Sequence, residues 1–203
     1  MPIEAVAIAA ALAVALWLRP WRLLAGGRFV TPLLATLVLV PWLWALPALH
    51  KMPLQLPWSG ACLVLLMLGW PLAIPALVAA GAITVFIAPV SVEAATSTVF
   101  WQGVLPATLA LALGAALRRW APRHMFVYLM GRAFLGTAVC LFATSLLAQA
   151  AGHSLPGISE DLSTISHWLT AWGEAVVTGM LGAIFVAFRP QWLATWSDDR
   201  YLR

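Results

Sequence analysis

The chain has 203 residues, of which 63% are hydrophobic and 9% are charged, and its mean hydropathy is +0.95. This composition excludes an ordinary soluble globular domain and indicates a polytopic integral membrane protein surrounded by the lipid bilayer. The net charge of +4 does not indicate nucleic-acid binding, because the arginines form short clusters beside apolar runs, where they set the orientation of a chain in the membrane.

Charged residues, proline and glycine divide the apolar sequence into segments. A membrane-spanning helix needs about 20 apolar residues, so the chain has room for about seven spans and no separate soluble domain. Gly69, Trp70 and Pro71 divide a run that is too long for one span, since proline is tolerated in the first turn of a helix. The sequence therefore predicts an all-α fold in a single transmembrane domain over residues 1–203, with helices at 3–18, 29–48, 59–70, 71–89, 99–117, 124–150 and 165–188.

The first segment, AVAIAAALAVAL, carries small residues at helical spacing. Ala7, Ala11 and Ala15 follow one another at four-residue intervals and share one face of a helix. Such a stripe lets a second helix approach closely. Two interpretations stay open: the stripe packs inside this protein, or it docks onto a partner membrane protein.

Arginines follow the first, fifth and seventh segments. Successive spans alternate in direction, so these three segments end on the same side if the number of spans is odd. All of them then lie on one side of the membrane. Since basic residues accumulate on the cytoplasmic side, we expect the N-terminus outside and the C-terminus in the cytoplasm. The residues concerned are Arg19, Arg22, Arg28, Arg118, Arg119, Arg123, Arg189, Arg200 and Arg203.

Several side chains that bind metals fall near the outer ends of the predicted helices. Imidazole, thioether and thiolate groups suit nickel, cobalt, copper or zinc. No two of the histidines have a tight ligand spacing such as HxxxH, and the alternative is that they are hydrated residues of the interface. The candidate metal ligands are His50, Met52, Cys62, His153 and His167.

Two charged residues of opposite sign lie well inside predicted spans, Arg132 in the sixth and Glu174 in the seventh. Ionisable groups inside a membrane are costly, so each is a candidate functional residue. Their depths, counted at about 1.5 Å per residue, are close enough for an arginine side chain to bridge. We therefore predict a buried ion pair, which either locks the two helices together or takes part in substrate passage.

Motifs typical of enzymes are missing. The sequence has no GxSxG, no HExxH and no phosphate-binding loop of the GxxxxGK[ST] kind. The sequence thus does not indicate an enzyme, and an ATP-driven activity would need a separate nucleotide-binding subunit.

Four stretches together resemble the membrane component of cobalt/nickel-type energy-coupling-factor ABC transporters, a family associated with cobalamin biosynthesis. WSGACLVLLMLGWPLAIPALVAA is similar to the family's Ser-Gly-His helix, its break and the helix that follows. GVLPATLALALGAALRR resembles the fifth span, and AWGEAVVTGMLGAIFVAFRP resembles the last helix with its Gly-Glu pair. The tail RPQWLATWSDDRYL resembles a divergent branch of the family in proteobacterial inner membranes.

The resemblance implies a substrate-capturing subunit in the bacterial inner membrane that works with separate ATPase subunits and a transmembrane coupling subunit. It implies no resident cofactor, and a transition-metal ion of the cobalt/nickel class or a related small solute would be the substrate.

This chain departs from the family at two metal ligands. The family begins Met-His-Ile, where this chain has Pro2, and its Ser-Gly-His motif has Ala61 in place of the histidine. This chain would then need different metal ligands or a different substrate. A second hypothesis from another class follows: a non-transporting membrane scaffold or assembly protein that uses the same fold.

Overall fold

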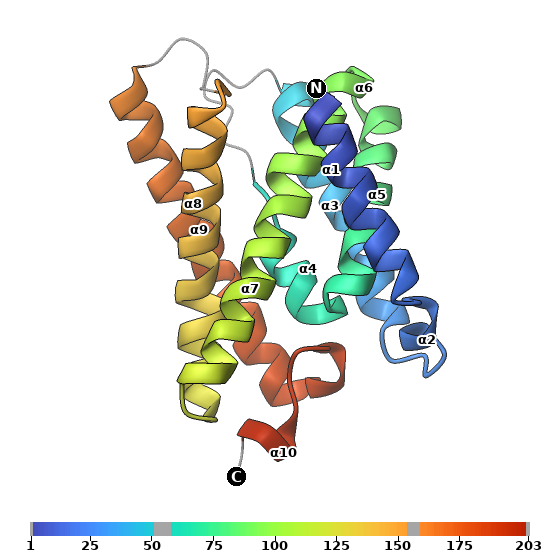
Figure 1. Ribbon diagram of the computed structural model, residues 1–203, viewed down its shortest axis with the longest axis vertical. Coiled ribbons are helices and arrows are strands. Elements are labelled where there is room, and N and C mark those ends of the chain that lie inside the picture. The colour runs from blue at the N-terminus through green and yellow to red at the C-terminus, as the bar shows by residue number, and fades with distance from the viewer. Residues whose placement is uncertain (1, 51–57, 154–158, 202–203) are drawn as a thin grey trace.

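In the computed structural model, residues 2–50, 58–153 and 159–201 are described, and those residues contain helices and no strand (Figure 1). The predicted all-α fold is confirmed. Two of the helices, η1 and η2, are π-helical, and η3 is a short 3₁₀ helix. In chain order the elements are α1 (Pro2–Trp17), α2 (Trp21–Leu24), α3 (Val30–His50), α4 (Ala61–Leu68), α5 (Trp70–Ile87), α6 (Val92–Thr98), η1 (Val99–Val104), α7 (Leu105–Trp120), η2 (Val127–Leu135), α8 (Gly136–Ala150), α9 (Glu160–Phe188), η3 (Pro190–Trp192) and α10 (Asp198–Tyr201).

In the described part of the chain, five helical stretches are long and apolar enough to cross a membrane, which is compatible with a multi-pass membrane protein. They are Val30–Leu49, Trp70–Ile87, Val92–Trp120, Val127–Ala150 and Glu160–Phe188, and the apolar stretch Ile3–Trp17 is shorter. The predicted span over 59–70 is wrong as a full crossing. The helix there, α4, has eight residues and rises about 12 Å, less than half of the roughly 30 Å hydrocarbon core.

Two glycines set the ends of α4. Gly60 has φ +69° in the left-handed helical region, and Gly69 has φ +70° with an extended ψ of 157°. Glycine adopts both positive-φ conformations without the strain of a side chain. Gly69 ends α4 and α5 begins at the next residue, with Pro71 in its first turn. The predicted break at Gly69, Trp70 and Pro71 is therefore confirmed.

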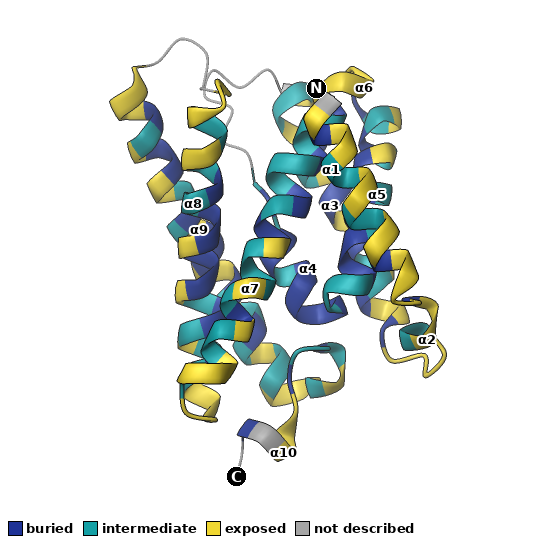
Figure 2. Cartoon of the chain, in the orientation of Figure 1, coloured by how far each residue is buried: buried dark blue, intermediate teal, exposed yellow. Residues whose placement is uncertain are grey.

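The helices form two groups around α4. α1 and α3 pack on α5, α8 packs on α9, and α7 and α4 lie between these groups (Figure 1). Most of α4 is buried, whereas the outer faces of the bundle carry exposed apolar side chains (Figure 2). Phe86, for example, is 89% exposed. α4 is thus a short, buried helix with polar groups at its end, and large apolar side chains cover the outside of the bundle. A soluble protein exposes mostly polar and charged side chains, so this exterior suits a lipid environment.

The segment after α9 folds back under α4. The backbone N–H of Ala194 donates to the carbonyl of Met67 at 3.0 Å, and that of Thr195 donates to Leu66 at 3.3 Å. These bonds satisfy carbonyls at the C-terminal end of α4 that have no partner within the helix. Trp196 and Tyr201 are buried in the same segment, which therefore belongs to the folded bundle.

The two ends of the bundle differ in charge. α2, the end of α7 and the segment after α9 lie at the same end, opposite to the start of α1 (Figure 1). The arginine clusters in these elements thus share one end, as the sequence predicts. The orientation of that end toward the cytoplasm stays a prediction.

Candidate functional site

Glu174 is held by the N-terminal turn of α4. It lies in α9, is 2% exposed, and its carboxylate accepts hydrogen bonds from the backbone N–H of Ser59 and, at 2.9 Å, of Gly60. The left-handed conformation of Gly60 helps to aim successive N–H groups at one anion. The first N–H groups of a helix carry partial positive charge and lack partners within the helix. Glu174 thus caps a helix 115 residues away in sequence.

The predicted ion pair between Arg132 and Glu174 does not form. The guanidinium of Arg132 lies against Gly114 of α7 and near the ring of Tyr128, with 6.0 Å from its carbon to the ring centre. Its Nε and Nη1 atoms have no hydrogen-bond partner. The prediction failed because it compared only the depths of Arg132 and Glu174 along their two helices. Backbone N–H groups at the start of α4 reach the carboxylate of Glu174 instead.

The Ser59–Gly60 turn is fixed by two further contacts. Trp44 Nε1 donates to the carbonyl of Ser59 at 3.1 Å, and Ser59 Oγ donates to the carbonyl of Gln102 at 2.5 Å. Gln102 lies in η1, four residues before Pro106, which has no N–H to donate back to that carbonyl. The proline therefore frees an acceptor that the turn uses.

A small cavity of about 40 Å³, the polar cavity, opens beside this turn, and both polar side chains and apolar surface line it. A cavity of roughly 10–15 Å³ holds one water, so the space suits a few waters or one small ion. His167 is 8% exposed and its Nε2 has no hydrogen-bond partner. The lining residues are Ser59, Trp101, Gln102, Leu141, Thr144, Ser145, His167, Thr170, Ala171 and Glu174.

Several groups in the cavity wall offer hydrogen-bond acceptors. Thr144 and Thr170 each donate their hydroxyl proton to a carbonyl of their own helix at 2.8 Å, which leaves oxygen lone pairs as acceptors. The carboxylate of Glu174 also has lone pairs beyond the two that accept from α4. With the free nitrogen of His167, these groups suit a cation or a solute rich in N–H or O–H donors. Within the described residues, no three His, Cys, Asp or Glu side chains gather closely enough to hold a metal by themselves.

The predicted metal ligands whose side chains are described are not brought together. Cys62 is buried in α4 and packs in a cluster with Cys140, and both are free thiols. His153 lies elsewhere, with its Nε2 at 3.3 Å from a carboxylate oxygen of Glu4. Among the histidines whose side chains are described, His167 is the one that lines the polar cavity. Met52 and the side chain of His50 lie outside the described residues.

Glu4 is a buried acid that the sequence analysis did not identify. It is 5% exposed, and it accepts hydrogen bonds from Trp101 Nε1 at 2.6 Å and Ser97 Oγ at 3.2 Å. Trp101 also lines the polar cavity, so α1 is tied to the cavity wall through this contact. The signal in the sequence was a lone carboxylate at the very start of an apolar run.

The alanine stripe of α1 faces inward. Ala15 is fully buried and Ala11 packs against the core, with α1 resting on α5. Ala7 is partly buried. Of the two interpretations, internal packing is therefore supported, and docking through this stripe is not. A separate apolar groove of about 360 Å³ runs between α1, α5 and α6, with Ala5 and Ala9 among its lining residues.

Searches against protein-family models, curated proteins and solved structures find no match to this chain.

Proposed function

We propose that the protein is the substrate-binding integral-membrane subunit of an importer of the energy-coupling-factor type, which takes up a transition-metal ion of the cobalt/nickel class or a related small solute. The observation that carries this proposal is the polar cavity at the broken helix α4, walled by Glu174 and His167. The remaining lining comes from two residues of a π-helical segment, from hydroxyl side chains, and from the apolar residues Leu141 and Ala171.

Broken helices are where membrane transporters commonly bind their substrates. A helix that stops inside the membrane presents backbone groups and irregular structure that must line a cavity or be buried in protein. Here the break at Gly60 places two N–H groups and an acid at one wall of a polar cavity. π-Helical segments are likewise frequent at functional sites, and Trp101 and Gln102 of η1 line the cavity.

The ligand chemistry favours a small cation. His167 offers an imidazole nitrogen without a partner, and Glu174 offers a carboxylate. Imidazole and carboxylate are ligands that first-row transition metals accept. These two residues would stand in for the histidines that the family supplies where this chain has Pro2 and Ala61.

The partners follow from the resemblance. The chain has no phosphate-binding loop, so separate ATPase subunits and a transmembrane coupling subunit would supply the energy. The protein would lie in the bacterial inner membrane and carry out no enzymatic reaction of its own.

Metal binding to the detergent-purified protein tests this proposal. We expect near-stoichiometric retention of nickel, cobalt, copper or zinc after removal of excess metal, and at least a tenfold loss of affinity in His167→Ala. His124→Ala is the matched control, because this exposed histidine lies just before η2, outside the cavity lining, and the variant should bind metal as the unmodified protein does. No retention of any of the four ions, or equal binding in both variants, would overturn a metal-ion site at His167.

One observation favours the second candidate, a non-transporting membrane scaffold or assembly protein. Glu174 already accepts two backbone hydrogen bonds, and this explains a buried acid without any substrate. If the protein is a scaffold, we expect the purified protein to carry no bound metal and no co-purifying ATPase subunits. Copurification of an ATPase from the native membrane would contradict it.

A further inference from the structure

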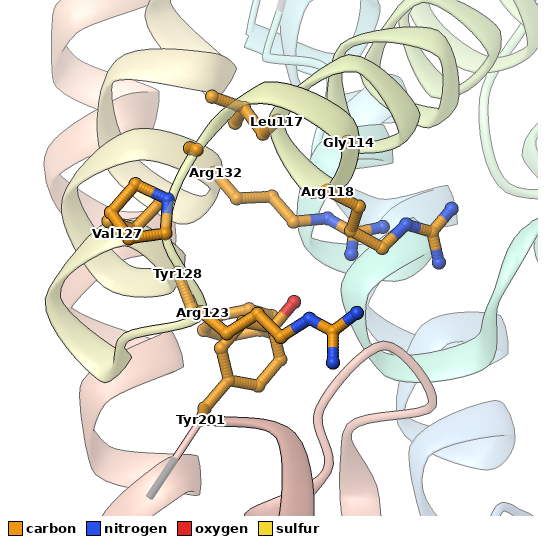
Figure 3. A pocket seen from close by; sticks show the side chains of 10 residues that line it. Gly114, Leu117, Arg118, Arg123, Val127, Tyr128, Arg132 and Tyr201 are labelled. Carbon is orange, nitrogen blue, oxygen red and sulfur yellow. The ribbon is translucent and has the colours of Figure 1, made fainter. Parts of the chain in front are cut away.

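A second cavity, whose lining includes three arginines and two tyrosines, lies between α7, η2 and the segment after α9. It has a volume of about 310 Å³ and lies at the end of the bundle that carries the arginine clusters (Figures 1 and 3). Its lining residues are Gly114, Leu117, Arg118, Ala121, Pro122, Arg123, Val127, Tyr128, Arg132 and Tyr201. A neighbouring cavity of about 430 Å³ shares Arg118 and Arg132 with it.

Arg132 places a buried charge in this cavity. The side chain is 7% exposed, and its Nε and Nη1 atoms have no hydrogen-bond partner among the described residues. Tyr128 and Tyr201 lie beside it (Figure 3). A buried guanidinium with unused donors is costly unless an anion completes its hydrogen bonds.

Gly114 makes room for the guanidinium. A Cβ atom at this position of α7 would lie 2.7 Å from Nε and 2.8 Å from the central carbon of Arg132. Only a residue without a side chain lets the charged group lie against the helix backbone here. The position of Arg132 is thus built into the packing of α7 against η2.

Two more arginines converge on the same space. Arg118 and Arg123 line the same cavity, and their side chains extend to the same side as that of Arg132, with the guanidinium of Arg118 farthest out (Figure 3). No aspartate or glutamate is among the described residues that line either cavity. Asp198, in the segment after α9, accepts a hydrogen bond from Trp196 Nε1 at 2.6 Å and lines a different cavity. Three positive charges therefore face a polar space without a lining carboxylate.

We propose that this cavity binds a phosphate group, and that the source is the headgroup of an anionic phospholipid. Arginine presents planar pairs of N–H donors that match phosphate oxygens. Basic pockets between helices at the cytoplasmic side of a membrane are suited to anionic headgroups. Trp120 is 80% exposed and Phe126 63% exposed beside the arginines, so acyl chains have apolar surface to cover. The inference is independent of the metal-ion proposal, since the two cavities share no residue.

Native mass spectrometry of the detergent-purified protein tests the site, with phosphatidylglycerol and phosphatidylcholine added separately. We expect at least a tenfold preference for phosphatidylglycerol, lost in Arg132→Gln. Because that variant changes a buried residue, Arg118→Gln with Arg123→Gln provides a second test at exposed positions. Arg119→Gln is the matched control, since this neighbour of Arg118 on α7 lines neither cavity, and it should keep the preference.

Inorganic phosphate distinguishes the two sources of a bound phosphate group, a phospholipid headgroup and a soluble phosphate compound. If phosphate at millimolar concentration raises the melting temperature of the unmodified protein but not of Arg132→Gln, and the lipids show no preference, a soluble phosphate compound is the ligand. Equal binding of the two lipids in all variants, together with no response to phosphate, would overturn the proposal.

Discussion

At the scale of single residues, Glu174 is explained by the groups it touches. The carboxylate accepts from two backbone N–H groups at the start of α4, and hydrogen bonds to a charged acceptor are stronger than neutral ones. It also neutralises the positive end of a helix that begins inside the protein. A structural role for this acid therefore holds whether or not the cavity beside it binds a substrate.

Replacement of Glu174 by glutamine tests this capping role. Glutamine has one acceptor oxygen, and its NH₂ group would face the second N–H donor. We expect the free energy of unfolding to fall by roughly 1–3 kcal/mol, measured by equilibrium unfolding in mixed detergent micelles. Glu160→Gln, an exposed acid in the first turn of the same helix, is the control. Equal stability of the two variants would contradict the capping role.

At the scale of elements, α4 is a half-helix because glycine begins it and ends it. Gly60 and Gly69 have space around them, since the nearest atom to a Cβ would be 4.0 Å away at Gly60 and 3.4 Å away at Gly69. The requirement for glycine is therefore one of backbone conformation. A side chain at a left-handed position costs energy even where nothing obstructs it.

Alanine at either glycine should destabilise the protein by about 1–2 kcal/mol. Gly173→Ala is the matched control, because this glycine lies inside α9 with open space around it, and alanine in a helix is favoured by about 0.5–1 kcal/mol. Thermal unfolding in detergent compares the three variants. If Gly60→Ala were as stable as Gly173→Ala, the sharp start of α4 would not depend on the left-handed residue.

At the scale of the whole molecule, local sequence patterns predicted the helices but not their contacts. Apolar runs divided by charged residues, proline and glycine located the helical segments, and the pair Trp70–Pro71 marked a break. The same patterns could not show that 59–70 holds a half-helix, because its apolar residues look like those of a short span. Nor could they predict the contact of Glu174 with residues 59 and 60 or the return of residues 194 and 195 to α4. Those contacts depend on three-dimensional packing between distant segments.

The candidate site was predicted only in part for the same reason. Glu174 and His167 were identified from their chemical type, and both line the polar cavity. Ser59 and Gln102 carry common polar groups that have no special pattern in sequence. Their role arises because the chain breaks at Gly60 and because Pro106 frees a carbonyl.

The orientation of the whole bundle can be tested with single cysteines. Cys62 and Cys140 are both buried, so the unmodified protein should react little with a membrane-impermeant maleimide and serves as the control. Glu93 is exposed in α6, at the end where α1 begins, and Arg119 is exposed at the opposite end of α7 (Figure 1). Because basic residues accumulate on the cytoplasmic side, we expect Glu93→Cys to be labelled in intact cells from which any outer membrane has been removed.

Arg119→Cys should be labelled only after the membrane is made permeable. The reverse pattern would place the arginine clusters outside, and with them the cavity around Arg132. An anionic headgroup of the inner leaflet could then not reach that cavity, so this labelling experiment also decides which leaflet must be supplied when lipid binding is measured in a bilayer.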